Sequence, residues 1–459
     1  MSNSSADQWT PDSWKRKPVS QQIKYGDSEA LAQVIDKLRQ LPPLVSASEV
    51  DSLKSHIADA QEGRAFILQG GDCAESFSDC NAEAISQKVR LLMSLSLLVS
   101  QQTQKPVIRI GRIAGQYAKP RSELTETQDQ TTLPSYRGDL VNHVHFSESA
   151  RMPDPARMLQ GYSYASLTIN YIRSLLEGDI SDLFQLEQES QDLLSLKTNA
   201  KLHKSLDQFR EAMRLFHQAN GPQHNSRHWL EFFTSHEALH LHYEEALTRK
   251  ANNGKWYNLS THYPWVGMRT TIQDSAHIEY LRGIANPIAI KVGKDLSPET
   301  LVQLCKVLNP NNEAGRLTLI QRFGHQHITQ VLPDMIKAVQ AAGLKVLWSC
   351  DPMHGNTRVS SQGIKTRDFQ HIQSELQQAF EIHAAHNTHL GGVHLEMTAE
   401  AVMECIGGTY GVTEQELDKA YTSLVDPRLN VAQVFELIDS LEEKQQHLHK
   451  IDTKHVSSS

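Results

Sequence analysis

The segment AFILQGGDCAESF, residues 65–77, sets the pattern from which the fold is predicted. Its apolar start is followed by Gly70 and Gly71, which is typical of a buried strand that ends abruptly. Glycine lets the backbone turn sharply or approach a ligand closely. Cys73 therefore stands at the end of a strand, where α/β enzymes place their chemistry. A lone cysteine is more often an ordinary buried residue, so the role of Cys73 depends on its neighbours.

Short apolar runs like the first one recur along the chain, and segments with helical spacing separate most of them. Counting the first, at 65–70, the predicted strands are eight, the other seven lying at 107–111, 229–234, 256–260, 287–292, 316–322, 345–350 and 390–396. The predicted helices between them lie at 82–101, 156–176, 237–249, 274–283, 297–307, 328–342 and 368–386. This alternation predicts a parallel sheet that closes into an α/β (β/α)8 TIM barrel. An open doubly wound sheet is the alternative, but no G-x-G-x-x-G follows the first strand.

Additional segments flank and interrupt the predicted barrel domain, residues 63–459. Residues 1–62 form an N-terminal extension, with a polar stretch at 1–25 that we expect to be loosely held. Helical spacing at 28–41 and 47–62 predicts two helices packed outside the barrel. Residues 177–227 predict an inserted surface helical pair. The tail, 413–450, is predicted to be helical apart from the loop TSLVDPRLN at 422–430.

Composition excludes several classes of partner. The 459-residue chain has a net charge of −8, which implies no general affinity for nucleic acid or anionic membranes. No apolar run approaches the length that crosses a bilayer, and the N-terminus lacks the apolar core of a signal peptide. Its five cysteines are scattered, which favours reduced thiols and a cytoplasmic location over a disulfide framework.

Potential metal ligands stand at several predicted strand ends. The loop WSCDPMHGNT, 348–357, carries His354, the last strand carries Glu396, and the loop at 422–430 carries Asp426. If the barrel is correct, these residues share a rim with Cys73. One thiolate, one imidazole and two carboxylates would hold Mn, Co, Fe or Zn better than Mg or Ca. Taken singly, each of these residues is more often hydrogen-bonded, solvated or paired with a cation.

Positive charge is concentrated at the same predicted rim. Lys or Arg at the end of an apolar strand must meet an anion or emerge into a cleft. In an acidic protein this local excess predicts anionic substrates, because guanidinium groups fit phosphate and carboxylate. Structural ion pairs with Asp72, Glu75 or Asp351 are the alternative. The cations concerned are Arg109, Arg112, Lys119, Arg121, Arg269, Lys291 and Arg322.

The segment HEALH, 236–240, matches the H-E-x-x-H pattern of zinc proteases. The pattern requires both histidines on one helix, but His236 adjoins a predicted strand. No third histidine or glutamate follows at the spacing that such proteases use. We therefore do not expect a protease.

Ten segments together resemble one family, the class II (plant-type) 3-deoxy-D-arabino-heptulosonate 7-phosphate (DAHP) synthases. They run from about residue 65 to 430 in family order: GGDCAESF, GRIAGQYAKPRS, YRGDLVN, SHEAL, RGIANPIAIKVG, LNPNNEAGR, DPMHGNT, GGVHLEMT, ECIGG and DPRLN. The resemblance implies a metal-dependent, aldol-like condensation of phosphoenolpyruvate with D-erythrose 4-phosphate. This reaction releases phosphate and opens the shikimate pathway to aromatic amino acids.

The resemblance also implies roles for individual residues. The metal, with Mn²⁺ or Co²⁺ the expected ion, would be held by Cys73, His354, Glu396 and Asp426. Phosphoenolpyruvate would be bound by Arg112, Met268, Arg269, Lys291 and Arg322, and erythrose 4-phosphate by Lys119, Arg121 and Ser122. The expected catalytic residues are Lys291, Cys73 and His354, with Lys291 a candidate proton donor because neighbouring cations lower the pKa of an ammonium group.

One position departs from the family pattern. Family members usually read G-E-R-T where this chain has Gly267, Met268, Arg269 and Thr270. Met268 can replace that Glu if phosphoenolpyruvate is contacted only by the backbone N–H at this position. If the Glu carboxylate instead orients an arginine, affinity for phosphoenolpyruvate should suffer.

The remaining expectations concern regulation and assembly. The N-terminal helices and the 177–227 insertion resemble regions that the family uses for effectors and subunit contacts. We therefore expect a homo-oligomer, dimer or tetramer, and aromatic amino acids as possible effectors. Three alternatives stay open: a paralogue that supplies a secondary metabolite such as a phenazine, a degenerate regulatory subunit, and a metal-dependent hydrolase on the same barrel.

Overall fold

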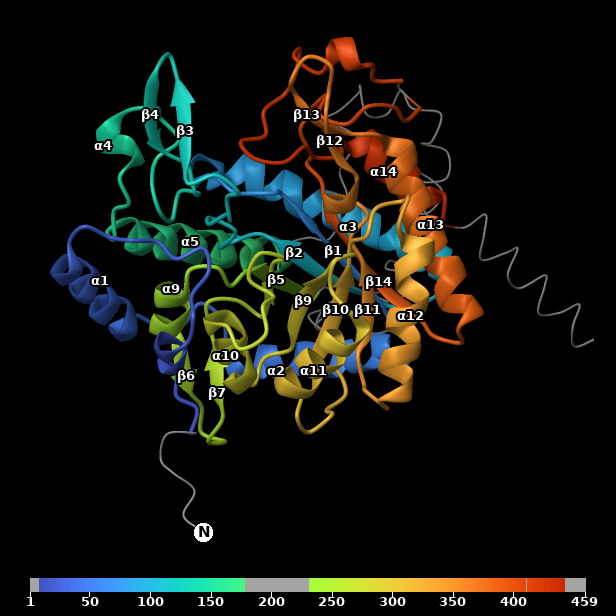
Figure 1. Ribbon diagram of the computed structural model, residues 1–459, viewed down its shortest axis with the longest axis horizontal. Coiled ribbons are helices and arrows are strands. Elements are labelled where there is room, and N and C mark those ends of the chain that lie inside the picture. Colours follow the sequence, from blue (N-terminus) through green and yellow to red (C-terminus); the bar gives the residue numbers. More distant parts are fainter. Residues whose placement is uncertain (1–7, 178–230, 410, 442–459) are drawn as a thin grey trace, which may run out of the picture.

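Eight parallel strands form a closed barrel in a computed structural model that describes residues 8–177, 231–409 and 411–441. Their order around the barrel is β1-β14-β11-β10-β9-β8-β5-β2 (Figure 1). The predicted (β/α)8 barrel is therefore confirmed, and the open sheet is excluded. The strands are β1 (Phe66–Gly71), β2 (Val107–Arg112), β5 (Phe232–Glu237), β8 (Tyr263–Val266), β9 (Ile288–Val292), β10 (Leu317–Gln321), β11 (Leu347–Cys350) and β14 (Leu390–Glu396).

Helices cover the outside of the barrel and are interspersed with the strands along the chain (Figure 1). Most of them begin at a side chain that accepts hydrogen bonds from the first turn, as Asn81 does for α3 and Ser297 for α11. The apolar faces of most of them pack with the strands in one large core, whereas the buried residues of α5 belong to two smaller clusters. The helices are α3 (Ala82–Thr103), α5 (Arg157–Glu177), α9 (Leu241–Ala246), α10 (Ala276–Gly283), α11 (Pro298–Leu308), α12 (Ile328–Ala341), α13 (Phe369–Ala385) and α14 (Val431–Asp439).

The second N-terminal helix lies across the end of the barrel where the strands begin. Helix α1 (Ser28–Gln40) lies to one side, but α2 (Ala47–Gln61) contacts β1, β11 and β14 (Figure 1). Leu53 and Ile57 of α2 belong to the same buried cluster as the barrel residues Ile67, Ile110 and Phe233. The expectation that both helices pack outside the main body therefore needs correction, because α2 closes the bottom of the barrel core.

Residues 8–25 are held against the barrel, so the expectation of a loose segment is wrong for this part. The indole of Trp14 is 2% exposed, and its Nε1 donates to Glu245 at 3.0 Å. Trp9 Nε1 donates to the carbonyl of Glu279 at 2.8 Å. The two tryptophans bury apolar surface against the barrel, although the residues around them in the sequence are mostly polar.

Two predictions near the middle of the barrel also need correction. The run at 256–260 is not a barrel strand: β7 (Trp256–Asn258) pairs in antiparallel fashion with β6 (Thr248–Lys250) in a hairpin outside the barrel. The fourth barrel strand is β8, whose Pro264 lacks a backbone N–H and so weakens the strand signal. The third barrel strand, β5, begins three residues later than predicted. Of the helix predicted at 237–249, only α9 is helical.

Further short elements lie outside the barrel strands, near the mouth of the barrel. They include two hairpins, β3 (Thr125–Gln128) with β4 (Thr131–Pro134) and β12 (Thr357–Val359) with β13 (Lys365–Arg367). The tail prediction is partly wrong, because only a short 3-10 turn, Glu414–Glu416, precedes the loop at 422–430. The predicted insertion at 177–227, apart from Glu177 at the end of α5, and the tail beyond 441 lie outside the described residues. Within the described residues, no helix combines the length and apolarity needed to cross a bilayer.

Candidate active site

The register of three neighbouring strands brings Arg112 and Glu396 together. Gly71 at the end of β1 pairs with Arg112 of β2 on one side and with Glu396 of β14 on the other. Both side chains are almost wholly buried, and Arg112 Nη2 lies 3.0 Å from Glu396 Oε1. The same guanidinium donates to the carbonyl of Cys73 at 3.1 Å. The carboxyl ends of these strands therefore form one charged rim.

Three of the four predicted metal ligands form a compact group. Ligand atoms of Cys73, Glu396 and Asp426 all lie within 4.8 Å of one another. The Cys73 thiol donates to Asp426 Oδ2 at 3.3 Å. His354 stands beside this group, with Nε2 3.1 Å from Glu396 Oε1, and its Nδ1 lies 2.7 Å from Asp351 Oδ2. A buried thiol next to two carboxylates, with an imidazole at the edge, fits a divalent transition metal.

Positive charges surround Glu396. Burial opposes its ionisation, but His354, Arg367 and Arg112 together hold the pKa of the Glu396 carboxyl well below its ordinary value. Arg367 of β13 is fully buried, with Nη2 2.8 Å from Glu396 Oε2. Arg367 is not recognisable from the sequence as a site residue, because β13 is a short hairpin strand outside the barrel.

The pKa of the Cys73 thiol is shifted upward, whereas that of the Glu396 carboxyl is shifted downward. Burial raises the pKa of the thiol well above the ordinary value, and the neighbouring Glu396 carboxylate acts in the same direction. The ammonium of Lys119, 3.8 Å from Glu396 Oε1, opposes this shift. The cluster thus contains a carboxylate that stays charged beside a thiol that stays protonated in the protein alone.

A buried ion network positions the loop of Asp426 against the loop of Cys73. Arg428 donates to Asp72 Oδ1 at 2.7 Å and to Glu404 Oε1 at 2.8 Å. Glu404 also accepts hydrogen bonds from the backbone N–H groups of Thr422 and Ser423. The alternative that the rim cations pair with Asp72 is therefore wrong, because the Asp72 carboxylate pairs with Arg428 instead. Its ion pair with Arg428 joins two loops across 356 positions of the chain.

A pocket beside this group contains most of the predicted substrate residues. Its lining includes Glu237 and Trp265 together with Arg112, Lys119, Met268, Arg269, Lys291, Arg322, His354 and Asp426. Arg121 and Ser122 are not among the lining residues, although Arg269 Nη2 donates to Ser122 Oγ at 2.6 Å. Arg109 is wrongly placed at the rim by the sequence: it donates to Ser96 of α3, on the outer side of the barrel.

Lys291, the last residue but one of β9, lines the pocket. Its ammonium pairs with Asp351, so here the structural alternative of an ion pair is correct. Burial lowers the pKa of Lys291 to about 8, Asp351 opposes the shift, and Arg112 contributes to it. Desolvation, rather than the neighbouring cations alone, is therefore the main cause of the expected low pKa.

Glu237 lines the pocket but is not among the site residues predicted from the sequence. It ends β5, and its Oε1 is buried without a hydrogen-bond partner in the described part of the chain. Burial raises the pKa of its carboxyl, against the pull of Lys119 and Lys291. The available signal was its place in SHEAL, residues 235–239, which is one of the ten family-like segments but carries no role for Glu237 there.

The two histidines of the HEALH segment lie on different elements. His236 belongs to β5 and lies 2.8 Å from Glu244 Oε1, whereas His240 caps α9 and lies 2.6 Å from the Tyr25 hydroxyl. The two histidines do not share a helix, and among the described residues they join no metal-binding group. The single-helix geometry that the H-E-x-x-H pattern requires is therefore not formed by these two histidines.

Comparison with known proteins adds a family to this geometry. The model of the class-II DAHP synthetase family matches residues 9–441. The chain belongs to this family. Three relatives are named phospho-2-dehydro-3-deoxyheptonate aldolase. They come from Neurospora crassa (43% identical, covering 94% of this chain and 92% of that protein), Streptomyces coelicolor (42%, 92% and 94%) and, with the added name AroG, Mycolicibacterium smegmatis (40%, 93% and 92%). Membership of the class-II DAHP synthetases confirms the resemblance of the ten motifs.

Proposed function

We propose that this class-II DAHP synthetase condenses phosphoenolpyruvate with D-erythrose 4-phosphate to give DAHP and phosphate, the first step of the shikimate pathway. The observation that supports it best is the buried group of Cys73, Glu396 and Asp426 at the edge of a pocket lined by five cationic side chains. A soft metal-ligand set beside concentrated positive charge suits a reaction between two phosphorylated substrates.

The metal would be held by Cys73, Glu396, Asp426 and His354, and Mn²⁺ or Co²⁺ fits this mixed set. When bound, the ion supplies Lewis-acid polarisation of the aldehyde oxygen. Asp351 accepts from His354 Nδ1, which leaves Nε2 directed at Glu396 and the ligand group. This is the usual arrangement by which a neighbouring carboxylate orients a ligating imidazole.

The cations of the pocket would bind phosphoenolpyruvate. Arg269, Lys291 and Arg322 supply charge for its phosphate and carboxylate, with Arg112 and the backbone at Met268 completing the site. Arg322 Nη2 donates to the carbonyl of His354 at 2.8 Å, which fixes this guanidinium relative to the metal ligands. Lys119, Arg121 and Ser122 would bind erythrose 4-phosphate. Fixing both substrates by their phosphates supplies proximity and orientation.

Proton transfer falls to Lys291. During the reaction C3 of phosphoenolpyruvate bonds to the aldehyde carbon, water adds at C2, and the C2–O bond to phosphate breaks. The aldehyde oxygen gains one proton. The water that adds at C2 loses two, one as it attacks and one as the C2 ketone forms, and the second of these leaves with the phosphate. An ammonium group with a pKa near 8 can donate at neutral pH, and the pocket places it beside Glu237, a buried carboxyl with a raised pKa that can accept.

The defining experiment measures phosphate release from phosphoenolpyruvate with and without erythrose 4-phosphate. We expect release that requires both substrates, disappears after EDTA treatment, and returns when Mn²⁺ or Co²⁺ is added back. Release that ignores the aldose would instead identify a metal-dependent hydrolase. If no phosphate were released under any of these conditions, the alternative of a degenerate regulatory subunit would be favoured.

Met268 gives a second prediction, because it replaces the usual family Glu. Its thioether packs closely on the backbone after β9, so that a Cβ at Gly293 would lie 2.4 Å from Met268 Cε. We expect the natural chain to be active and Met268→Glu to change kcat/KM for phosphoenolpyruvate by less than about tenfold, the equivalent of one hydrogen bond. Steady-state kinetics check this, and a rescue by Met268→Glu from near-zero activity would contradict it.

The cellular setting is proposed on the same basis. We infer a cytoplasmic homo-oligomer, dimer or tetramer, that supplies aromatic amino-acid synthesis and responds to aromatic amino acids. Sedimentation analysis with and without these amino acids tests the assembly.

A further inference from the structure

The N-terminal segment 17–21 contacts the loop that follows β8 at the mouth of the barrel. Ser20 Oγ donates to the carbonyl of Arg269 at 3.1 Å, and the carbonyl of Pro18 accepts from the backbone of Ala276 at 2.9 Å. This loop carries two of the residues proposed to bind phosphoenolpyruvate. The segment that the sequence suggested to be loose therefore holds a loop that lines the pocket.

The next residue, Gln21, contacts the loop that follows β2. Its Oε1 accepts hydrogen bonds from the backbone N–H of Arg121 at 3.0 Å and from Arg137 Nη2 at 3.1 Å. Its backbone carbonyl accepts from the same Nη2 at 2.7 Å. The carbonyl of Arg137 in turn accepts from the backbone N–H of Lys119 at 2.9 Å. One glutamine thus fixes the backbone around both cations proposed for erythrose 4-phosphate.

The chemistry of this contact suits a phosphate subsite. Arg137 is 9% exposed, and among the described residues no carboxylate forms an ion pair with it. A neutral amide oxygen orients the guanidinium without cancelling its charge, which a glutamate at position 21 would do. Gln21 also has φ = +58°, a left-handed conformation that is costly for a side chain other than glycine or asparagine. Such strain is found where the surrounding structure requires a particular placement.

We propose that Gln21 is a positioning residue for the phosphate of erythrose 4-phosphate, acting through the backbone of Arg121 and the guanidinium of Arg137. The proposal rests on the proposed function, which assigns that substrate to Lys119, Arg121 and Ser122. It adds the N-terminal segment to the substrate site.

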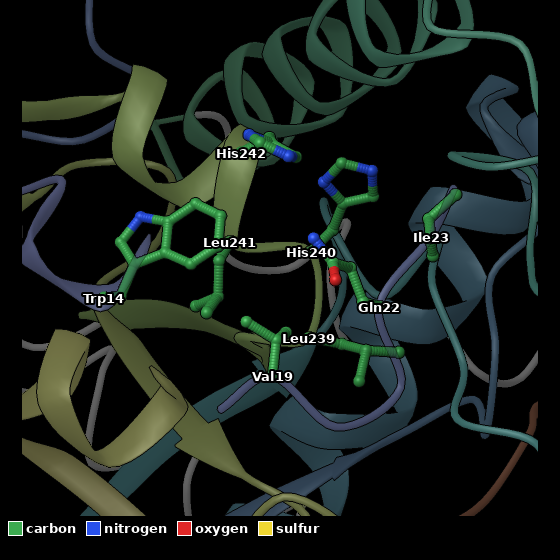
Figure 2. A pocket seen from close by; sticks show the side chains of 8 residues that line it. All are labelled: Trp14, Val19, Gln22, Ile23, Leu239, His240, Leu241 and His242. Atoms are coloured by element: carbon green, nitrogen blue, oxygen red, sulfur yellow. The ribbon is translucent and has the colours of Figure 1, made fainter. Parts of the chain in front are cut away.

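The test compares two neighbouring glutamines. Gln21→Met keeps length and volume but removes the acceptor. Gln22→Met makes the same change one residue on, where the side chain is exposed and joins no hydrogen bond in the described ranges. Figure 2 shows Gln22 beside His240, among the residues that line a small cavity separate from the pocket described above. Gln21→Gly is a third variant, because glycine adopts the left-handed conformation without strain.

The readout is the KM for each substrate and kcat, measured with metal-loaded full-length enzyme, together with Tm. We expect Gln21→Met and Gln21→Gly to raise KM for erythrose 4-phosphate about tenfold, the effect of one to two lost hydrogen bonds, with kcat and KM for phosphoenolpyruvate within about threefold of the natural enzyme. Gln22→Met should match the natural enzyme.

Three outcomes would overturn the proposal while leaving the proposed function intact. Gln21→Met could leave KM for erythrose 4-phosphate unchanged in an active enzyme, Gln22→Met could have the same effect, or both KM values could rise equally with a fall in Tm. A natural chain that makes no DAHP from the two substrates would reject the proposed function itself, and the role of Gln21 with it.

Discussion

Cys73→Ser should reduce affinity for Co²⁺ by at least about 100-fold, because a soft ligand is replaced by a hydroxyl that binds transition metals weakly. The substitution keeps the side-chain size and can still donate to Asp426, as the thiol does at 3.3 Å. Glu396 and Asp426 would remain in place, so residual binding through oxygen ligands should persist. DAHP formation should fall by a similar factor at limiting metal.

Direct binding separates this result from a loss of fold. Titration of the metal-free protein with Co²⁺ should give thiolate-to-metal charge-transfer absorption in the natural chain and none in Cys73→Ser. Cys80→Ser is the matched control, because Cys80 is a half-buried thiol that contacts Tyr164 and Thr168, away from the ligand group. If Cys73→Ser bound Co²⁺ with the same affinity and the same absorption as the natural chain, Cys73 would not be a metal ligand.

Lys291→Met should lower kcat by about 100- to 10,000-fold, the range for loss of a general acid. Methionine fills a similar volume but cannot donate a proton or balance Asp351. Co²⁺ affinity should change little, since Lys291 is not one of the proposed ligands. Lys294→Met is the control, because Lys294 is an exposed lysine in the loop just after β9. Retained kcat with only a raised KM for phosphoenolpyruvate would reduce Lys291 to a binding residue.

The pH profile provides an independent test of Lys291. With its pKa lowered to about 8, the ammonium form dominates below pH 8 and is lost above it. The natural enzyme should therefore lose kcat/KM as pH rises through about 8, and Lys291→Met should lack this limb. The charged or titratable groups that face Lys291 are Asp351, Arg112, Arg322, Glu237 and His394. A basic limb that survives in Lys291→Met would assign it to another group.

Much of the fold was predictable because each strand and helix carries a local signal. The glycine-terminated run before Cys73 and the alternation that follows it are determined by residues close together in sequence. The errors arose where packing overrides such signals. Pro264 weakens the real fourth strand, and the apolar run that includes Trp256 belongs to a hairpin. Trp14 turns a polar segment into a packed one.

The candidate site was predictable in residue type but not in arrangement. Arg112, Lys291 and Glu396 stand at strand ends, where a parallel barrel gathers its functional side chains. Glu237 was overlooked because a buried, unpaired carboxyl cannot be recognised without its surroundings. Gln21 was overlooked because its partners, Arg121 and Arg137, lie 100 or more residues away.

The sequence by itself determined the barrel, the family and the chemical character of the rim, since these depend on residue types in local order. The tertiary structure decided which of those residues meet. The pairing of Gly71 with Glu396 and the Asp72–Arg428 ion pair each join residues more than 300 positions apart, and the pairing of Gly71 with Arg112 completes the rim. Such contacts depend on strand register and loop packing, which no short stretch of sequence specifies.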